Sequence, residues 1–195
     1  MPDYFEFMGF PRQIALDQEK LQRRYYELSR DYHPDFHMQG DEEARQKSLE
    51  NSSLLNQAYR TLNDPYERAR YLLALEWPDL PEGEKKKIPP ALLMEVMEMQ
   101  EKVAEAQFAD DPAKKEEIHR ELLDIEARLK IKTDGLRAEL DRLAESWSAL
   151  PEGTDRAGKQ ATLGALNTLL NTRSYLRTLL ATIDAAVRGG KGVRH

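Results

Sequence analysis

Apolar side chains recur along the first third of the chain at the spacing of helices that bury one face. Between residues 18 and 32 this stripe falls at i, i+4, i+7 and i+11, on Leu21, Tyr25, Leu28 and Tyr32. Asp17 stands where an N-cap is expected. A second stripe, at Leu55, Ala58, Tyr59 and Leu62, predicts a helix from residue 41 to about residue 62. The two patterns predict an antiparallel helical hairpin.

Shorter helices are expected on either side of this hairpin. Residues 3–10 are rich in aromatic side chains and end at Gly9 and Pro11, while residues 66–73 restart a helix after Asp64 and Pro65. The N-terminal half of the second hairpin helix is polar, and we expect no deep burial there, at Lys47, Ser48, Asn51 and Ser52.

The second half of the chain shows the same period over longer distances. Helices are predicted over residues 91–108, 113–147 and 155–187, with breaks at Asp111-Pro112 and at Pro151-Glu152-Gly153. The inward positions of the last two helices are Ile118, Leu122, Ile125, Leu129, Leu136, Leu140, Leu143, Trp147, Leu166, Leu169, Leu176, Leu180 and Ile183. Because short loops join long amphipathic helices, we expect an antiparallel three-helix bundle.

These elements make the fold class all-α, in two domains. Four prolines and a glycine fall within residues 77–90 and predict a linker. The expected domains are therefore residues 1–76 and the bundle at 91–188, followed by a flexible tail at 189–195.

Composition limits the possible functions. The 195 residues carry 29 Lys+Arg against 35 Asp+Glu, a net charge of −6, so whole-surface binding to nucleic acid is not expected. The absence of cysteine excludes disulfides, thiolate metal sites and cysteine ligands to an iron–sulfur cluster. No apolar run is long enough to cross a membrane, and no leader segment precedes the first helix, so we expect a cytoplasmic protein.

The first hairpin helix concentrates positive charge against this negative background. From residue 20 to residue 30 there are four cations and one acid, the cations being Lys20, Arg23, Arg24 and Arg30. Such a face favours an acidic partner, although a solvated helix face would have the same composition. The tripeptide His33-Pro34-Asp35 follows directly. It makes a stiff polar tip suited to protein recognition, or a simple turn that ends a helix.

Metal binding is the alternative for this loop, because His33, Asp35 and His37 are spaced two residues apart. The spacing suits a strand, whereas Pro34 and the flanking helices indicate a loop, and further ligands would have to come from His119 or His195. The sequence shows no paired nucleophile and base, no phosphate loop and no dinucleotide fingerprint, and it implies no cofactor.

The helix expected at residues 91–108 has a second apolar stripe. Leu92, Val96 and Met99 share the core face, whereas Leu93, Met94 and Met97 project elsewhere. Acids accompany this outer stripe, at Glu98, Glu101 and Glu105. It is either a binding surface, for which methionine is well suited, or a face that another helix covers.

The order of these motifs resembles that of a J-domain: an aromatic first helix, a basic helix, His33-Pro34-Asp35, and a long helix that ends at Asn63-Asp64-Pro65. The run from Glu67 to Leu73, with Arg68, Ala69, Tyr71 and Leu72, resembles one subfamily, the HscB-type co-chaperones of iron–sulfur cluster assembly. That family also carries a C-terminal three-helix domain, so the resemblance covers nearly the whole chain.

The resemblance implies two partners and no enzymatic activity. His33, Pro34 and Asp35, with the four cations before them, would engage a DnaK/HscA-type chaperone and stimulate its ATPase. Leu93, Met94, Met97, Glu98, Glu101 and Glu105, completed by Tyr175, would bind an IscU-like cluster scaffold protein. Many J-domains have a basic residue after the aspartate, where this chain has Phe36, so the strength of chaperone binding stays open. The alternative is a general J-domain protein whose C-terminal helices recruit other clients or dimerise.

Overall fold

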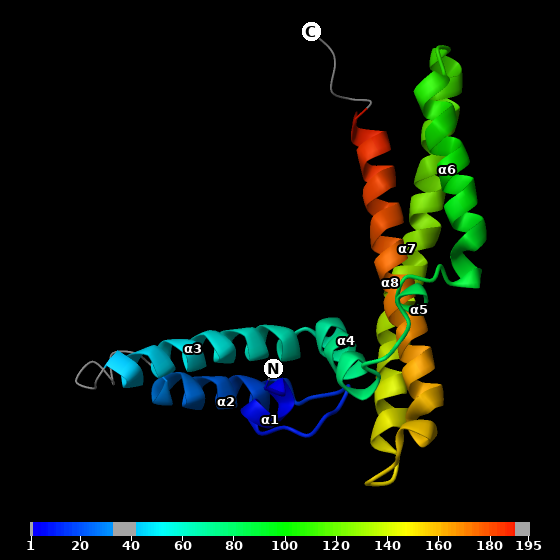
Figure 1. The fold of residues 1–195 in the computed structure, drawn as a ribbon. Coiled ribbons are helices and arrows are strands. Elements are labelled where there is room, and N and C mark those ends of the chain that lie inside the picture. Colours follow the sequence, from blue (N-terminus) through cyan, green and yellow to red (C-terminus); the bar gives the residue numbers. More distant parts are fainter. Residues whose placement is uncertain (1, 33–41, 190–195) are drawn as a thin grey trace. The chain divides into compact units, whose positions relative to one another are not determined.

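The computed structural model describes residues 2–32 and 42–189, and all regular structure in these ranges is helical (Figure 1). The confirmed all-α fold contains helices α1 (Tyr4–Met8), α2 (Gln18–Asp31), α3 (Glu42–Asn63), α4 (Pro65–Glu76), α5 (Glu82–Lys85), α6 (Leu93–Phe108), α7 (Pro112–Ser148) and α8 (Arg156–Gly189). A short 3-10 helix, η2 (Pro90–Leu92), leads into α6. The helices that periodicity predicts are all present, with ends within a few residues of the expected ones.

The contacts between residues group the chain into two compact units. The first unit contains residues 1–78 together with 143–163, and the second contains 79–142 together with 164–195. The end of α7, the following turn and the start of α8 thus belong with the N-terminal helices. Trp147 was expected inside the C-terminal bundle, but its partners lie in the first unit.

In the first unit, α2 and α3 form the expected hairpin, and α1 and α4 pack against α3 (Figure 1). Its core contains Phe5, Met8, Leu21, Leu28, Leu55, Ala58, Leu62, Ala69 and Leu72, all at most 5% exposed. The Asp17 side chain accepts a hydrogen bond from the Lys20 N–H, which is the cap expected for α2. Asp64, expected only to end the helix before it, also caps α4 ahead of Pro65. Local capping and a shared core face explain why this stretch folds as a hairpin.

Arg68 is a buried charge in this core, with only 3% of its surface exposed. Its Nε donates to the Ile14 carbonyl over 2.7 Å, and its Nη1 donates to the Leu62 carbonyl at the end of α3. These bonds satisfy main-chain oxygens that would otherwise be buried without a partner. Arg68 therefore links the segment before α2 to the end of α3 by hydrogen bonds.

The end of α7 enters the first unit through Trp147, which is 7% exposed. Its indole Nε1 donates to the Arg12 carbonyl over 2.9 Å, and the Lys159 ammonium lies 5.3 Å from the ring centre. Lys159 also pairs with Glu76 at 2.7 Å, and Glu76 accepts from Arg12 at 3.1 Å. Contacts from three separate stretches of sequence meet in this cluster.

In the second unit, the segment that follows Asp79 packs on α8 instead of running free. Leu80 is 5% exposed, and the carbonyl of Glu84 accepts hydrogen bonds from the side-chain amides of Asn167 and Asn171. Buried leucines and isoleucines of η2, α7 and α8 form the core together with Val96 and Met99 of α6. They are Leu92, Ile118, Leu122, Ile125, Leu129, Leu136, Leu140, Leu166, Leu169, Leu176 and Ile183. The prolines in residues 77–90 limit helix formation without preventing packing. In the described ranges, no helix is long and apolar enough to cross a membrane.

Candidate functional site

The basic surface predicted on α2 is present, and its four members are Lys20, Arg23, Arg24 and Arg30. The Lys20 Nζ lies 3.7 Å from Oδ2 of Asp17, the N-cap of α2, and the Arg24 Nη1 lies 3.2 Å from Oε2 of Glu27. Arg23 and Arg30 are exposed and form no ion pair with the residues that the structure describes. Two guanidinium groups are therefore available to carboxylates of a partner without breaking an internal contact.

Tyr26 adds an aromatic group to this surface that the sequence reasoning missed. Its side chain is 56% exposed, and its ring meets the edge of Tyr25 with centres 5.6 Å apart. At 100° per residue it falls beside Arg23 and Arg30 and away from the buried stripe. A second tyrosine directly after the stripe residue Tyr25 is the signal that could have revealed it.

The tripeptide His33-Pro34-Asp35 lies outside the described residues, and so does the alternative metal set of His33, Asp35 and His37. What the structure does describe is the approach to this loop. Ser48 of α3 is only 4% exposed, and its hydroxyl donates to the Tyr32 carbonyl over 2.8 Å. The expectation that Ser48 would not be deeply buried is wrong, because this hydrogen bond satisfies a carbonyl at the open end of α2. Among the described residues, no group of histidine, aspartate and glutamate could hold a metal ion.

The outer stripe of α6 is exposed to solvent. Leu93, Met94 and Met97 are 48%, 76% and 59% exposed, whereas Val96 and Met99 on the core face are at most 8% exposed. We call Leu93, Met94, Met97, Glu98, Glu101 and Glu105 the α6 surface. In the second unit, no described helix covers these three apolar side chains, so the alternative of a stripe covered by a neighbouring helix of that unit is wrong.

The three acids of the α6 surface differ in their surroundings. Glu98 accepts from Arg128 of α7 at 2.7 Å, and Glu105 lies 3.1 Å from Lys102. Lys102 also contacts Glu121 of α7 at 3.0 Å, and hydrogen bonds to Glu121 and then Glu105 raise the pKa of Lys102 above its usual range. Glu101 is exposed and has no ion pair with a described residue. It is the acid most available to a cationic partner.

Tyr175 lies on α8, where its hydroxyl donates to the Lys86 carbonyl over 2.7 Å. This bond ties Tyr175 to the segment that precedes α6. Its participation in a binding surface with Leu93, Met94 and Met97 remains a prediction.

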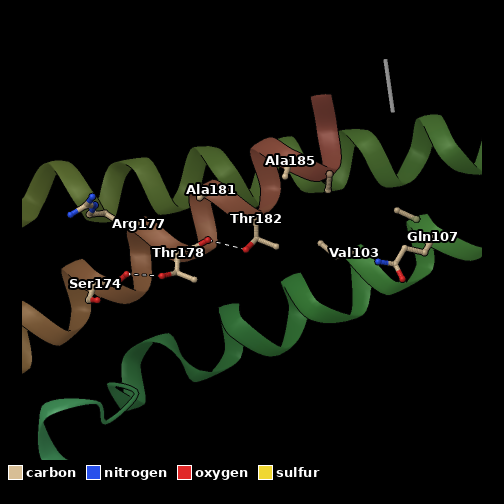
Figure 2. A pocket seen from close by; sticks show the side chains of 10 residues that line it. Val103, Gln107, Ser174, Arg177, Thr178, Ala181, Thr182 and Ala185 are labelled. Atoms are coloured by element: carbon tan, nitrogen blue, oxygen red, sulfur yellow. Dashed lines mark hydrogen bonds between the residues drawn. The ribbon is translucent and has the colours of Figure 1, made fainter. Parts of the chain in front are cut away.

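Phe108, at the C-terminal end of α6, is a further exposed side chain that the sequence reasoning missed. It is 84% exposed and falls within 20° of Met97 around the helix. A groove of about 880 Å³ separates the ends of α6 and α8 (Figure 2). The groove is lined by alanine, serine and threonine side chains of α8 and by Arg177, with Val103 and Gln107 facing them from α6. Thr178 and Thr182 donate their hydroxyls to the carbonyls one turn before them, whereas Gln107, Ser174 and Arg177 are the other polar side chains of the groove.

Comparison with protein families gives two matches along the chain. Residues 3–71 match the DnaJ domain, and residues 88–156 match the HSCB C-terminal oligomerisation domain. Together the two matches cover more than half of the chain.

The similar individual proteins carry one description. The iron–sulfur cluster co-chaperone protein HscB of Mus musculus is 42% identical over 105 residues, and that of Homo sapiens is 41% identical over 105 residues. Each alignment covers 54% of this chain and 45% of the relative, so the chain spans less than half the length of these relatives.

Solved structures agree with the fold. The human co-chaperone protein HscB aligns with a TM-score of 0.63 and 29% identity, over 94% of this chain and 81% of that one. The chaperone HscB from Vibrio cholerae aligns with a TM-score of 0.59 and 23% identity, over 97% and 98% of the two chains. The second likeness shows the fold alone.

Proposed function

Because this chain belongs to the HscB-type family of J-domain co-chaperones, we propose that it binds an iron–sulfur cluster scaffold protein and delivers it to a DnaK/HscA-type chaperone, whose ATPase it stimulates. The family is one of co-chaperones and not of enzymes, which disfavours a metal-dependent enzyme built on His33, Asp35 and His37.

The chaperone would be engaged by the first unit. His33, Pro34 and Asp35 would contact the ATPase together with the basic surface of α2. The guanidinium groups of Arg23 and Arg30, which form no ion pair with a described residue, support this role, because they would gain carboxylate partners without breaking such a pair. The chemistry of ATP hydrolysis stays in the chaperone, and the co-chaperone would favour the conformation of the ATPase that hydrolyses.

The scaffold protein would be bound by the second unit, through the α6 surface and Tyr175. The observation that carries this assignment is the exposure of Leu93, Met94 and Met97 beside three acids. Contiguous exposed apolar side chains with a polar rim are typical of a protein interface. A partner with an apolar centre and a basic rim would be complementary.

Holding both partners on one chain would raise the local concentration of scaffold at the chaperone. No contact between the two partners is needed for this effect. The co-chaperone would therefore act as an adaptor that carries no cluster ligand itself, in keeping with a chain that has no cysteine.

Two variants test the two arms separately. His33→Gln should abolish ATPase stimulation in a steady-state phosphate-release assay while scaffold affinity by calorimetry is unchanged, and His119→Gln on α7 is the matched control. The triple variant Leu93→Ala, Met94→Ala, Met97→Ala should weaken scaffold binding more than tenfold and leave stimulation by the free co-chaperone unchanged. Normal stimulation by His33→Gln would overturn the chaperone assignment. Unchanged scaffold affinity of the triple variant would overturn the other.

A second function has one observation in its favour: the family description of residues 88–156 names an oligomerisation domain. A general J-domain protein that dimerises through its C-terminal helices would use exposed groups there, such as Phe108 at the end of α6. Sedimentation velocity over a hundredfold concentration range distinguishes the two functions. A dimer that Phe108→Ser dissociates, without any binding of scaffold, would favour this alternative.

A further inference from the structure

Ile131 of α7 is an apolar side chain that neither proposed surface includes, yet it is 72% exposed. Single exposed apolar residues are common and need no explanation. Ile131 differs because its immediate surroundings are the ion pairs that join α7 to α6. Arg128, one turn before it, pairs with Glu98, and the adjacent residue Lys132 pairs with Glu95.

These two ion pairs set the register of the helices. The Lys132–Glu95 pair brings the level of Ile131 on α7 to the level of Met94 on α6, because each apolar residue is the sequence neighbour of one member of the pair. The Arg128–Glu98 pair, with Nη2 and Oε1 2.7 Å apart, fixes the next turn of both helices. The Glu95 side chain is only 15% exposed, so the packing around it also restricts its movement.

The direction of the side chains follows from helical geometry. Arg128 points toward α6, and Ile131 is turned about 60° farther from the core than Arg128. On α6, Glu98 points toward α7, and Met94 is turned about 40° farther from the core than Glu98. Both apolar side chains therefore lie on the outer side of the same row of ion pairs. Met94, at 76% exposed, and Ile131 flank the Arg128–Glu98 bridge from the two helices.

We propose that the scaffold-binding surface extends from α6 onto α7, with Ile131 as a further apolar contact across the Arg128–Glu98 ion pair. This inference rests on the proposed function of the α6 surface. The occupant is the same scaffold protein, because Ile131 continues the exposed apolar stripe of Met94 and Met97. Glu101, which has no ion pair with a described residue, lies on the same helix as that stripe. A partner with an apolar centre and a basic rim would straddle both helices.

The test measures scaffold affinity by calorimetry for Ile131→Ser and for Ile131→Gln, which retains more bulk. Because the side chain is exposed, both variants should keep the thermal unfolding midpoint. Each should weaken binding about three- to tenfold while leaving chaperone stimulation by the free co-chaperone unchanged. Leu49→Ser is the matched control, since Leu49 is 47% exposed in the first unit, and it should bind as the parent does.

The outcomes separate this inference from the function on which it rests. Unchanged affinity of both Ile131 variants, with weak binding by the Leu93, Met94 and Met97 triple variant, would overturn the extension and leave the proposed function standing. Unchanged affinity of all variants would overturn the proposed function. Equal weakening by Leu49→Ser would show a non-specific effect and overturn the extension. A non-additive loss in Ile131→Ser combined with Met94→Ala would support one continuous surface.

Discussion

The indole Nε1 of Trp147 donates a hydrogen bond over 2.9 Å to the carbonyl of Arg12, a residue 135 positions earlier in the chain. The bond joins the end of α7 to the segment between α1 and α2. It makes the last turns of α7 part of the unit that presents the basic surface. A C-terminal helix thereby stabilises the N-terminal helical hairpin.

Replacing Trp147 should destabilise the first unit in two steps. Trp147→Phe removes the donor and leaves the Arg12 carbonyl without it, which should cost about 1 kcal/mol. Trp147→Ala also empties a buried site and should cost about 3–5 kcal/mol. Urea unfolding by circular dichroism gives the free energies, and amide exchange should show lost protection in α1–α4. Trp77→Phe is the control, and intact protection in Trp147→Ala would contradict the prediction.

Ser48→Ala should loosen the approach to the His33-Pro34-Asp35 loop. The hydroxyl that is lost donates to the Tyr32 carbonyl at 2.8 Å, so the variant leaves a main-chain acceptor at the end of α2 unsatisfied. The expected loss is about 1–2 kcal/mol of stability, with reduced ATPase stimulation at temperatures where the protein is still folded. Ser53→Ala, on an exposed part of α3, should change neither quantity. Full stimulation by Ser48→Ala would show that this hydrogen bond does not position the loop.

The carboxylate of Glu76 should make stability depend on acid pH. Burial alone would raise its pKa, but hydrogen bonds from Lys159 and Arg12 outweigh burial and hold the pKa of Glu76 below its ordinary value of 4.5. Because the pKa of Glu76 is lower in the folded state, its carboxylate stabilises the fold at pH values above the ordinary pKa. This stabilisation is lost as the pH falls through the lowered, folded-state pKa. Glu76→Gln should therefore be about 1–2 kcal/mol less stable at pH 7. The free energies of unfolding of the parent protein and of Glu76→Gln should become equal at acid pH. A difference in free energy of unfolding that stays constant down to the lowest pH would contradict a lowered pKa of Glu76.

Glu101 should matter more for scaffold binding than Glu98 does. Glu98 is already paired with Arg128 at 2.7 Å, whereas Glu101 has no partner among the described residues. Glu101→Gln should weaken binding several-fold at low ionic strength and flatten the salt dependence of the dissociation constant. Glu98→Gln should have the smaller effect. Calorimetry at two salt concentrations decides the order, and an equal effect of both variants would be inconsistent with it.

Helices were predictable from the sequence because the forces that form them are local. Asp17 caps the helix that follows it, as expected from its position alone, and the break expected at Asp64-Pro65 separates α3 from α4. The buried stripe of α2 and the exposed stripe of α6 also follow from spacing. The family signature around Arg68 acquires a physical reason only in the structure, where its guanidinium bonds the Ile14 and Leu62 carbonyls.

Pairings over long sequence distances could not be predicted in this way. Periodicity places Trp147 on an inward face, but it does not reveal that this face meets Arg12. The same holds for Ile131, whose level along α6 follows only from the ion pairs between α6 and α7. Ser48 was misjudged because a polar side chain was expected near water, whereas a single good hydrogen bond allows it to be buried.

The split of the first unit over residues 1–78 and 143–163 affects the order in which the protein can be completed during synthesis. Domains tend to fold as they emerge from the ribosome, from the N-terminus onward. Here the contacts of Trp147 and Lys159 with the first unit can form only after α5, α6 and most of α7 have been synthesised. A nascent chain that stalls before residue 143 would therefore present the cations of α2 on an unfinished unit.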